Sequence, residues 1–228
     1  MLTTSQETQS LLILASGSPR RRDLLSLLGL PFAVQASAVD EENHADEPGA
    51  AMVSRLSQAK ARALLAQTRA GLIVAADTTV WLDGQVLGKP ADAEDAVRML
   101  RRLRDRVHVV YSGVTLINAQ TGWMRSELAE SHVEMRNYSD EEIAAYVASG
   151  DPLDKAGSYA IQYADFRPVA RIVGCYANVM GLPLCHLYCM LREGGLAPAE
   201  TPVAACDRFN RRHCDVAAAI LGQACQHT

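Results

Sequence analysis

Apolar and polar positions along the chain follow two periods, one typical of strands and one typical of helices. Continuous apolar runs predict buried strands at residues 11–14 and 72–76, and helical spacing predicts helices beginning at Pro19 and near Pro48. The same reasoning predicts further strands at 32–35, 79–82, 85–87, 107–118, 123–136, 157–161 and 169–173, and further helices at 92–103, 139–147 and 184–192. This alternation predicts an α/β protein built around a mixed sheet.

Short polar motifs predict where some of these elements turn or begin. Asp83-Gly84 separates two apolar segments and predicts a hairpin turn. Ser139 followed by Glu142 predicts a capping box at the start of a helix.

The helix expected to begin at Pro19 has an unfavourable charge arrangement. Ser18 occupies the N-cap position, and Arg20, Arg21 and Arg22 follow in the first turn. A helix N-terminus has partial positive charge, so three cations there cost stability unless an anion binds. A phosphate chain would find backbone N–H groups and guanidinium groups there. The alternative, an ordinary capped helix with solvated arginines, fits this stretch alone equally well.

Composition limits the class of protein. The chain has 228 residues, of which 49% are hydrophobic and 21% charged, as expected for one large or two-lobed globular domain. Its net charge of −4 argues against non-specific nucleic-acid binding. It has no apolar run near the roughly 20 residues of a membrane span, and its polar start does not resemble a signal peptide, so we expect a cytoplasmic protein. We expect a disordered N-terminus at 1–10, one domain at 11–196 and a C-terminal extension of unknown role at 197–228.

All six cysteines fall in the last quarter of the chain and none forms a CxxC pair. In a cytoplasmic protein they are expected to be reduced thiols. A zinc site was weighed for the group near the C-terminus, but its spacing matches no common zinc pattern. That group consists of Cys206, His213, Cys214, Cys225 and His227.

Two acidic residues are candidates for chemistry. Asp77 follows the strand predicted at 72–76, at the end where open α/β sheets place their ligands. A carboxylate there could bind Mg²⁺ or activate water, or could simply cap the strand end. Glu41, in an acidic loop, could be a second carboxylate at the same metal or a solvated loop residue.

Two lysines and one glutamine complete this set. Lys60 lies on an apolar helix face, where its ammonium either reaches solvent or points into a cleft toward phosphate. Lys89 sits in a tight turn between a strand and a helix, within reach of phosphate. Gln162 can both donate to and accept from the edge of a base. The chain contains neither a Walker A motif nor a GxGxxG fingerprint.

Taken together, these segments resemble the Maf family of nucleoside triphosphate pyrophosphatases. The resemblance extends over roughly residues 11 to 193, and the segments fall in family order. The matching segments are 15–21, 39–41, 55–61, 76–78, 87–90, 154–159, 161–162 and 178–184.

The resemblance implies a fold, a reaction and a set of roles. It implies an elongated two-lobed α/β fold around a cleft, related to the inosine triphosphate pyrophosphatases, and a homodimer. The implied reaction cleaves a nucleoside triphosphate between its α- and β-phosphates, with a divalent metal, Mg²⁺ or Mn²⁺. Asp77 would accept a proton and bind metal with Glu41, and Lys60 and Lys89 would hold phosphates. The implied substrate-binding residues are Ser16, Ser18, Arg20, Arg21, Thr78, Asp154, Lys155 and Gln162.

The resemblance also favours one subfamily. Arg21, Thr78 and Gln162 match the positions that distinguish the members acting on dTTP and UTP. The chain departs from the family pattern at 103–106 and at 163–166, and the second of these segments borders the expected base pocket. Two alternatives remain, a 7-methyl-GTP pyrophosphatase and a nucleotide-binding regulator of septum formation.

Overall fold

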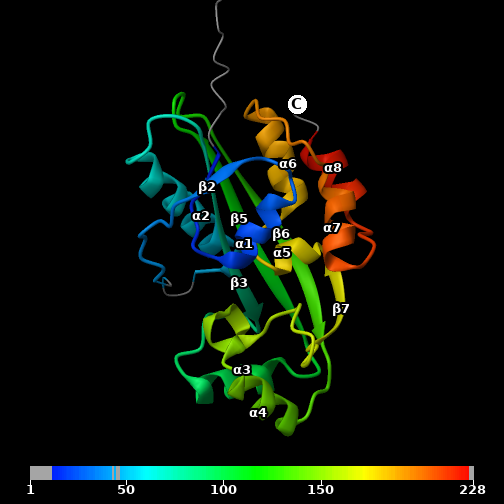
Figure 1. Cartoon of the computed structure of the whole chain (residues 1–228). Helices are drawn as coiled ribbons and strands as arrows, with labels where there is room; N and C mark the ends of the chain where they lie inside the picture. The colour runs from blue at the N-terminus through cyan, green and yellow to red at the C-terminus, as the bar shows by residue number, and fades with distance from the viewer. Residues whose placement is uncertain (1–11, 43, 45–46, 226–228) are drawn as a thin grey trace, which may run out of the picture.

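A mixed β-sheet runs through the molecule and confirms the predicted α/β class (Figure 1). The computed structural model describes residues 12–42, 44 and 47–225. Within them the strand order is β2-β1-β3-β5-β6-β7, with β4 paired to β3. Strand β1 is parallel to β2 and β3, and the other pairs are antiparallel. The strands are β1 (Leu12–Leu14), β2 (Phe32–Val34), β3 (Leu72–Leu82), β4 (Gln85–Leu87), β5 (Val107–Asn118), β6 (Met124–Met135) and β7 (Val169–Gly174).

Helices cover both faces of the sheet. Helix α2 packs on β3 and β5, while α1 and α6 share a core cluster with the opposite face. Helices α3 and α4 pack together at the far end of the sheet, which forms a second lobe (Figure 1). The helices are α1 (Pro19–Ser26), α2 (Gly49–Leu65), α3 (Ala93–Leu103), α4 (Asp140–Ala148), α5 (Tyr176–Val179), α6 (Leu184–Glu193), α7 (Pro202–Asn210) and α8 (Ala217–Ala224), with 3-10 turns η1 (Asp151–Asp154) and η2 (Ala156–Ser158).

Strand β3 connects the two lobes. Successive residues of a strand point to opposite faces, so Val74 packs in the cluster of α1 and α6 whereas Ile73 and Ala75 pack in the cluster beneath α2. Because both faces are covered, the strand reads as a continuous apolar run. Its far end, at Val80 and Leu82, belongs to the core of the second lobe. Strand β3 is therefore a single element that belongs to the cores of both lobes.

Gly113 on β5 lets helix α2 approach the sheet closely. A Cβ at this position would lie 2.4 Å from the Val53 carbonyl oxygen of α2, far inside van der Waals contact. The paired residue across the ladder is Asp77 on β3. The absence of a side chain at Gly113 thus sets how near α2 comes to the strand that holds Asp77.

Two predicted strand boundaries are wrong. Residues 72–82 form one strand, so Asp77 lies in its middle and not at its end. No strand forms at 157–161, where the chain has the 3-10 turn η2. Gly157 and Ser158 have φ values of 68° and 58°, in the left-handed region, which an extended strand cannot accommodate.

The predicted turn and cap signals are confirmed. Asp83-Gly84 joins β3 to β4 in an antiparallel hairpin. Ser139 Oγ accepts from the backbone N–H of Glu142, and the Glu142 carboxylate accepts from the Ser139 N–H, as a capping box requires.

The C-terminal extension contains the two helices α7 and α8. Both pack on α6. The prediction that all cysteines are reduced is wrong for one pair, because Cys189 on α6 is bonded to Cys225 just after α8. The segment predicted to be disordered, 1–10, lies outside the described residues, as does His227.

In the part of the chain that the structure describes, none of the helices has the length and apolar character to cross a membrane.

Candidate active site

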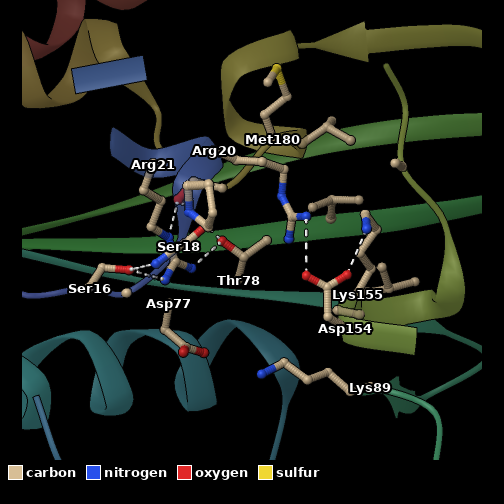
Figure 2. A pocket seen from close by; sticks show the side chains of 18 of the residues that line it. Ser16, Ser18, Arg20, Arg21, Asp77, Thr78, Lys89, Asp154, Lys155 and Met180 are labelled. Atoms are coloured by element: carbon tan, nitrogen blue, oxygen red, sulfur yellow. Dashed lines mark hydrogen bonds and ion pairs between the residues drawn. The ribbon is translucent and has the colours of Figure 1, made fainter. Parts of the chain in front are cut away.

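A pocket of about 370 Å³ brings together all of the predicted site residues. Its walls come from the start of α1, the 37–41 loop, α2, β3 and the η1–η2 segment (Figure 2). The predicted residues that line it are Ser16, Ser18, Arg20, Arg21, Glu41, Lys60, Asp77, Thr78, Lys89, Asp154, Lys155 and Gln162. Segments far apart in the sequence therefore converge on one cavity.

Lys60 links the two predicted carboxylates. Its Nζ lies 2.6 Å from Asp77 Oδ1 and 2.6 Å from Glu41 Oε1. Lys60 and Asp77 are each only 6% exposed, whereas the Glu41 side chain is about half exposed at 52%. The spacing of apolar residues predicted that Lys60 faces inward; its ammonium meets carboxylates and does not reach open solvent.

The environment of Asp77 shifts its ionisation toward neutral pH. Burial raises the pKa of Asp77, and the positive charges of Lys60 and Arg21 only partly oppose this rise. Glu41 differs: burial acts to raise its pKa too, but its hydrogen bond to Lys60 and the positive charges of Lys60, Lys89 and Arg21 together outweigh this, and the net pKa is lowered. A carboxylate with a raised pKa in a cleft is suited to accept a proton.

The carboxylates of Asp77 and Glu41 fit a divalent cation that the substrate helps to bind. Both contact the same ammonium, so both reach one small region. Among the described residues no three His, Cys, Asp or Glu side chains form a cluster that could hold a metal ion. Mg²⁺ is commonly bound by one or two carboxylates together with substrate phosphates and water, and not by a full protein cage.

Arg21 is half-buried and contacts three elements, whereas the alternative interpretation of the sequence expected a solvated arginine. Its Nε donates to the Gly181 carbonyl oxygen at 2.8 Å, and its Nη1 and Nη2 donate to Ser16 Oγ and Thr78 Oγ1 at 3.3 Å and 3.2 Å (Figure 2). Burial lowers the pKa of Arg21, while the charge of Asp77 opposes this shift. Arg21 thereby fixes α1 to β3 and to the turn after α5.

Sequence reasoning missed Ser112, a polar residue whose hydroxyl contacts Thr78. Thr78 Oγ1 lies 2.7 Å from Ser112 Oγ, which donates to the Asn178 carbonyl oxygen at 3.1 Å. Ser112 is fully buried on β5. No local motif distinguishes Ser112, because its role comes from antiparallel pairing with Thr78. Asn178 and Gly181, by contrast, lie in the matching segment 178–184.

Several donors and positive charges around the pocket are weakly paired, two of them at the start of α1. Ser18 is the N-cap, but its side chain makes no capping bond; instead its N–H donates to Ser16 Oγ at 3.2 Å. With the residues that the structure describes, the Arg20 side chain makes only a long ion pair, 3.9 Å from Nη1 to Asp154 Oδ2. Lys89 points into the pocket (Figure 2) and is in no ion pair with a described residue within 4.0 Å. These groups give the cavity the positive potential that phosphates require.

Lys155 is held more firmly than Arg20 or Lys89. Its Nζ donates to Asp154 Oδ1 at 2.6 Å and to the Asp151 carbonyl oxygen, and it lies 3.0 Å from Asp151 Oδ1. Its side chain is only 9% exposed. Because two carboxylates already balance its charge, Lys155 fixes the η1–η2 segment in place beside the pocket.

Part of the pocket wall is apolar, and Gln162 is an exposed residue in a turn that also lines the pocket. The residues of this apolar wall are Val80, Val110, Tyr159, Ala160, Ile161, Val179 and Met180. A pocket that offers both cationic and apolar side chains suits a ligand that has an anionic part and an apolar part.

The fold and the site together define an α/β protein whose pocket gathers cationic side chains around a buried carboxylate. Residues 11–194 match the family described as Maf-like protein. The chain belongs to that family, as the sequence resemblance implied.

Similar proteins share most of the chain. A dTTP/UTP pyrophosphatase of Moorella thermoacetica is 49% identical over 178 residues, covering 78% of this chain and 92% of that protein. A dTTP/UTP pyrophosphatase of Thermomicrobium roseum is 44% identical over 194 residues, covering 84% and 87%. Among solved structures, the Staphylococcus aureus Ham1 protein aligns with a TM-score of 0.39 and 14% identity, over 56% of this chain and 72% of that one.

Proposed function

We propose that this protein hydrolyses dTTP and UTP to the nucleoside monophosphate and pyrophosphate. The observation that supports it most is the buried Asp77–Lys60 pair in a pocket that both cationic and apolar side chains line. The relatives that are 40–49% identical over most of the chain bear the name dTTP/UTP pyrophosphatase.

In this proposal the triphosphate lies along the cationic side of the pocket. Arg20, Lys89 and the backbone N–H groups at the start of α1 bind its oxygens, with Ser18 at the turn. The base lies against the apolar wall, where the Gln162 amide reaches its polar edge. Arg21 and Thr78 shape the space between the two ends through their contacts with Ser16 and Gly181.

Asp77 is the proton acceptor in the proposed reaction. Its raised pKa, caused mainly by burial, makes it a stronger base than a solvated aspartate. It takes a proton from the water that attacks the α-phosphorus, and the bond to the β-phosphate oxygen breaks. Lys60 keeps Asp77 ionised and oriented, and Lys89 and Arg20 stabilise the charge that grows on the departing pyrophosphate. A divalent cation, Mg²⁺ or Mn²⁺, held by Asp77 and Glu41 would supply further charge neutralisation at the phosphates.

The working location proposed is the cytoplasm, where nucleoside triphosphates are made. The partner is the nucleotide itself, and the proposal involves neither nucleic acid nor membrane.

The experiment is pyrophosphate release from dTTP, UTP, CTP, the purine triphosphates and 7-methyl-GTP, with Mg²⁺ and with EDTA. Metal-dependent turnover led by dTTP and UTP is expected. Turnover led by 7-methyl-GTP would keep the chemistry but reject the substrate. If every nucleotide bound and none turned over, the regulator of septum formation would replace the enzyme.

A further inference from the structure

Tyr159 is the only aromatic side chain among the described residues that line the active-site pocket. It belongs to the core of the second lobe and is 6% exposed, so only part of its ring meets the pocket. The proposed function places a pyrimidine base on the apolar wall. Within that wall Tyr159 alone offers an aromatic ring, while the other members are aliphatic or sulfur-containing side chains.

A buried histidine holds the hydroxyl of Tyr159. His108 Nε2 lies 2.8 Å from Tyr159 Oη, and the two rings meet edge to face, with their centroids 5.4 Å apart. His108 is 2% exposed. It lies on β5 two residues before Val110, which lines the pocket, and residues two apart on a strand point to the same face. His108 therefore lies behind the pocket wall without lining the pocket itself.

The hydrogen bond runs from Tyr159 to His108. Burial lowers the pKa of His108 to about 3, so the ring is neutral and carries one N–H. Its Nδ1 is buried and has no hydrogen-bond partner in the described part of the chain. With the hydrogen on Nε2, both Nδ1 and the Tyr159 hydroxyl hydrogen would be unpaired; with the hydrogen on Nδ1, only that N–H is. Unpaired buried groups cost free energy, so Tyr159 donates to Nε2 and leaves only its ring for a ligand.

The main chain is fixed on both sides of Tyr159. Before it, Gly157 and Ser158 have φ values of 68° and 58°, a left-handed pair that turns the chain toward the pocket wall. After it, the Ala160 N–H donates to Tyr146 Oη at 2.9 Å. Together with the bond to His108, these contacts hold the Tyr159 ring in one orientation.

We propose that the pyrimidine base packs against the ring of Tyr159 and that His108 is a positioning residue for that ring. This inference deepens the proposed function and rests on it, since a substrate without a base would gain nothing from the contact. Aromatic side chains bind bases through their faces with little preference among bases. Tyr159 therefore supplies affinity for the base, while selection among bases stays with polar groups such as Gln162.

The test compares the binding of uridine monophosphate and ribose 5-phosphate to the full-length protein by calorimetry. The two ligands differ only in the base, and neither contains the anhydride bond that the proposed reaction breaks. Wild-type protein should bind uridine monophosphate more tightly. Tyr159→Leu should lower that affinity about 5-fold and leave the affinity for ribose 5-phosphate unchanged.

Tyr138→Leu is the matched control for this replacement. Tyr138 is a buried tyrosine of the same lobe, and its hydroxyl donates to the Leu100 carbonyl oxygen at 2.7 Å. It does not line the pocket. The control variant should therefore keep the wild-type ratio of the two affinities.

His108 is tested through its dependence on Tyr159. His108→Leu removes the acceptor and should lower the affinity for uridine monophosphate about 3-fold, and His108→Gln, whose amide oxygen can accept from Tyr159, should restore it. In the Tyr159→Leu background, His108→Leu should have no further effect. A residue that only supported the fold would lower the affinity for both ligands in either background.

A measurement on wild-type protein decides the question even if a variant does not fold. With ring-labelled tyrosine, bound uridine monophosphate should give a nuclear Overhauser effect between its H6 and a tyrosine ring signal that Tyr159→Phe lacks. The absence of this effect would overturn the proposal, as would equal wild-type affinities for the two ligands or an unchanged ratio in Tyr159→Leu.

Pyrophosphate release from dTTP and UTP by the wild-type protein is a separate result. Turnover without the Tyr159 effects would reject the base contact and leave the proposed hydrolysis standing. The Tyr159 effects without turnover would reject the hydrolysis and leave the base contact standing.

Discussion

The ammonium of Lys60 lies 2.6 Å from the carboxylate of Asp77, and each residue is only 6% exposed. The two come from different elements, α2 and β3, which pack closely because Gly113 presents no side chain to α2. Burying a lone carboxylate is costly, and Lys60 offsets part of that cost without cancelling it, since the pKa of Asp77 stays raised by burial. The pair therefore keeps inside the pocket a carboxylate whose pKa lies above that of a solvated aspartate.

Replacing Asp77 by Asn should remove turnover while leaving nucleotide binding. The amide keeps the shape of the carboxylate but cannot accept a proton, so we expect pyrophosphate release to fall about 10²–10⁴-fold. Binding is measured by calorimetry with a non-hydrolysable triphosphate. Asp83→Asn, on the surface turn after the same strand, is the control and should keep full activity. Wild-type turnover in Asp77→Asn would remove Asp77 from the mechanism.

The pH dependence of the rate should move in opposite directions in two variants. Lys60 lowers the pKa of Asp77 and Glu41 raises it. Since activity requires ionised Asp77, Lys60→Met should shift the acidic limb of the profile to higher pH, and Glu41→Gln should shift it to lower pH. kcat/KM is measured from pH 4 to 9. This distinguishes a shift of the acidic limb along the pH axis from a fall in the maximum value of kcat/KM. If the acidic limb moved in the same direction in both variants, it would not reflect the ionisation of Asp77.

Loss of Arg21 should destabilise the fold. Arg21→Ala removes three hydrogen bonds at a half-buried place, those to the Gly181 carbonyl oxygen, Ser16 Oγ and Thr78 Oγ1. We expect the free energy of unfolding to fall by about 2–3 kcal/mol. Urea titration measures this, with Arg22→Ala as the control, because Arg22 is exposed on the same turn of α1. Equal stability of the two variants would show that Arg21 does not bind these elements together.

Gly113→Ala should disturb the packing of α2. The new methyl group would meet a backbone carbonyl at 2.4 Å, which cannot rotate away. A loss of about 1–3 kcal/mol in stability is expected, with a fall in activity as Lys60 moves from Asp77. Gly222→Ala is the matched control, since that exposed helical glycine has open space around it. Unchanged unfolding of Gly113→Ala would mean that α2 is free to move outward without cost.

Much of the element pattern was predictable because its causes are local. The apolar run at 72–76, the capping box at Ser139 and the hairpin at Asp83-Gly84 each depend on neighbouring residues alone. The strand wrongly predicted at 157–161 shows the limit of this reasoning. Its composition suits a strand, but Gly157 adopts a left-handed conformation and packs against Val80 in the second lobe.

By itself, the sequence determined which side chains could do chemistry: the inward-facing Lys60, the isolated Asp77, and the arginines at a helix start. Only the tertiary structure decided which role each of these side chains has. It pairs Lys60 with both carboxylates, makes Arg21 a hydrogen-bonded link between three elements, and leaves Arg20 and Lys89 facing the cavity. The reason is that charge and spacing are properties of the chain. Burial, which sets the pKa of Asp77, arises only when distant elements pack together.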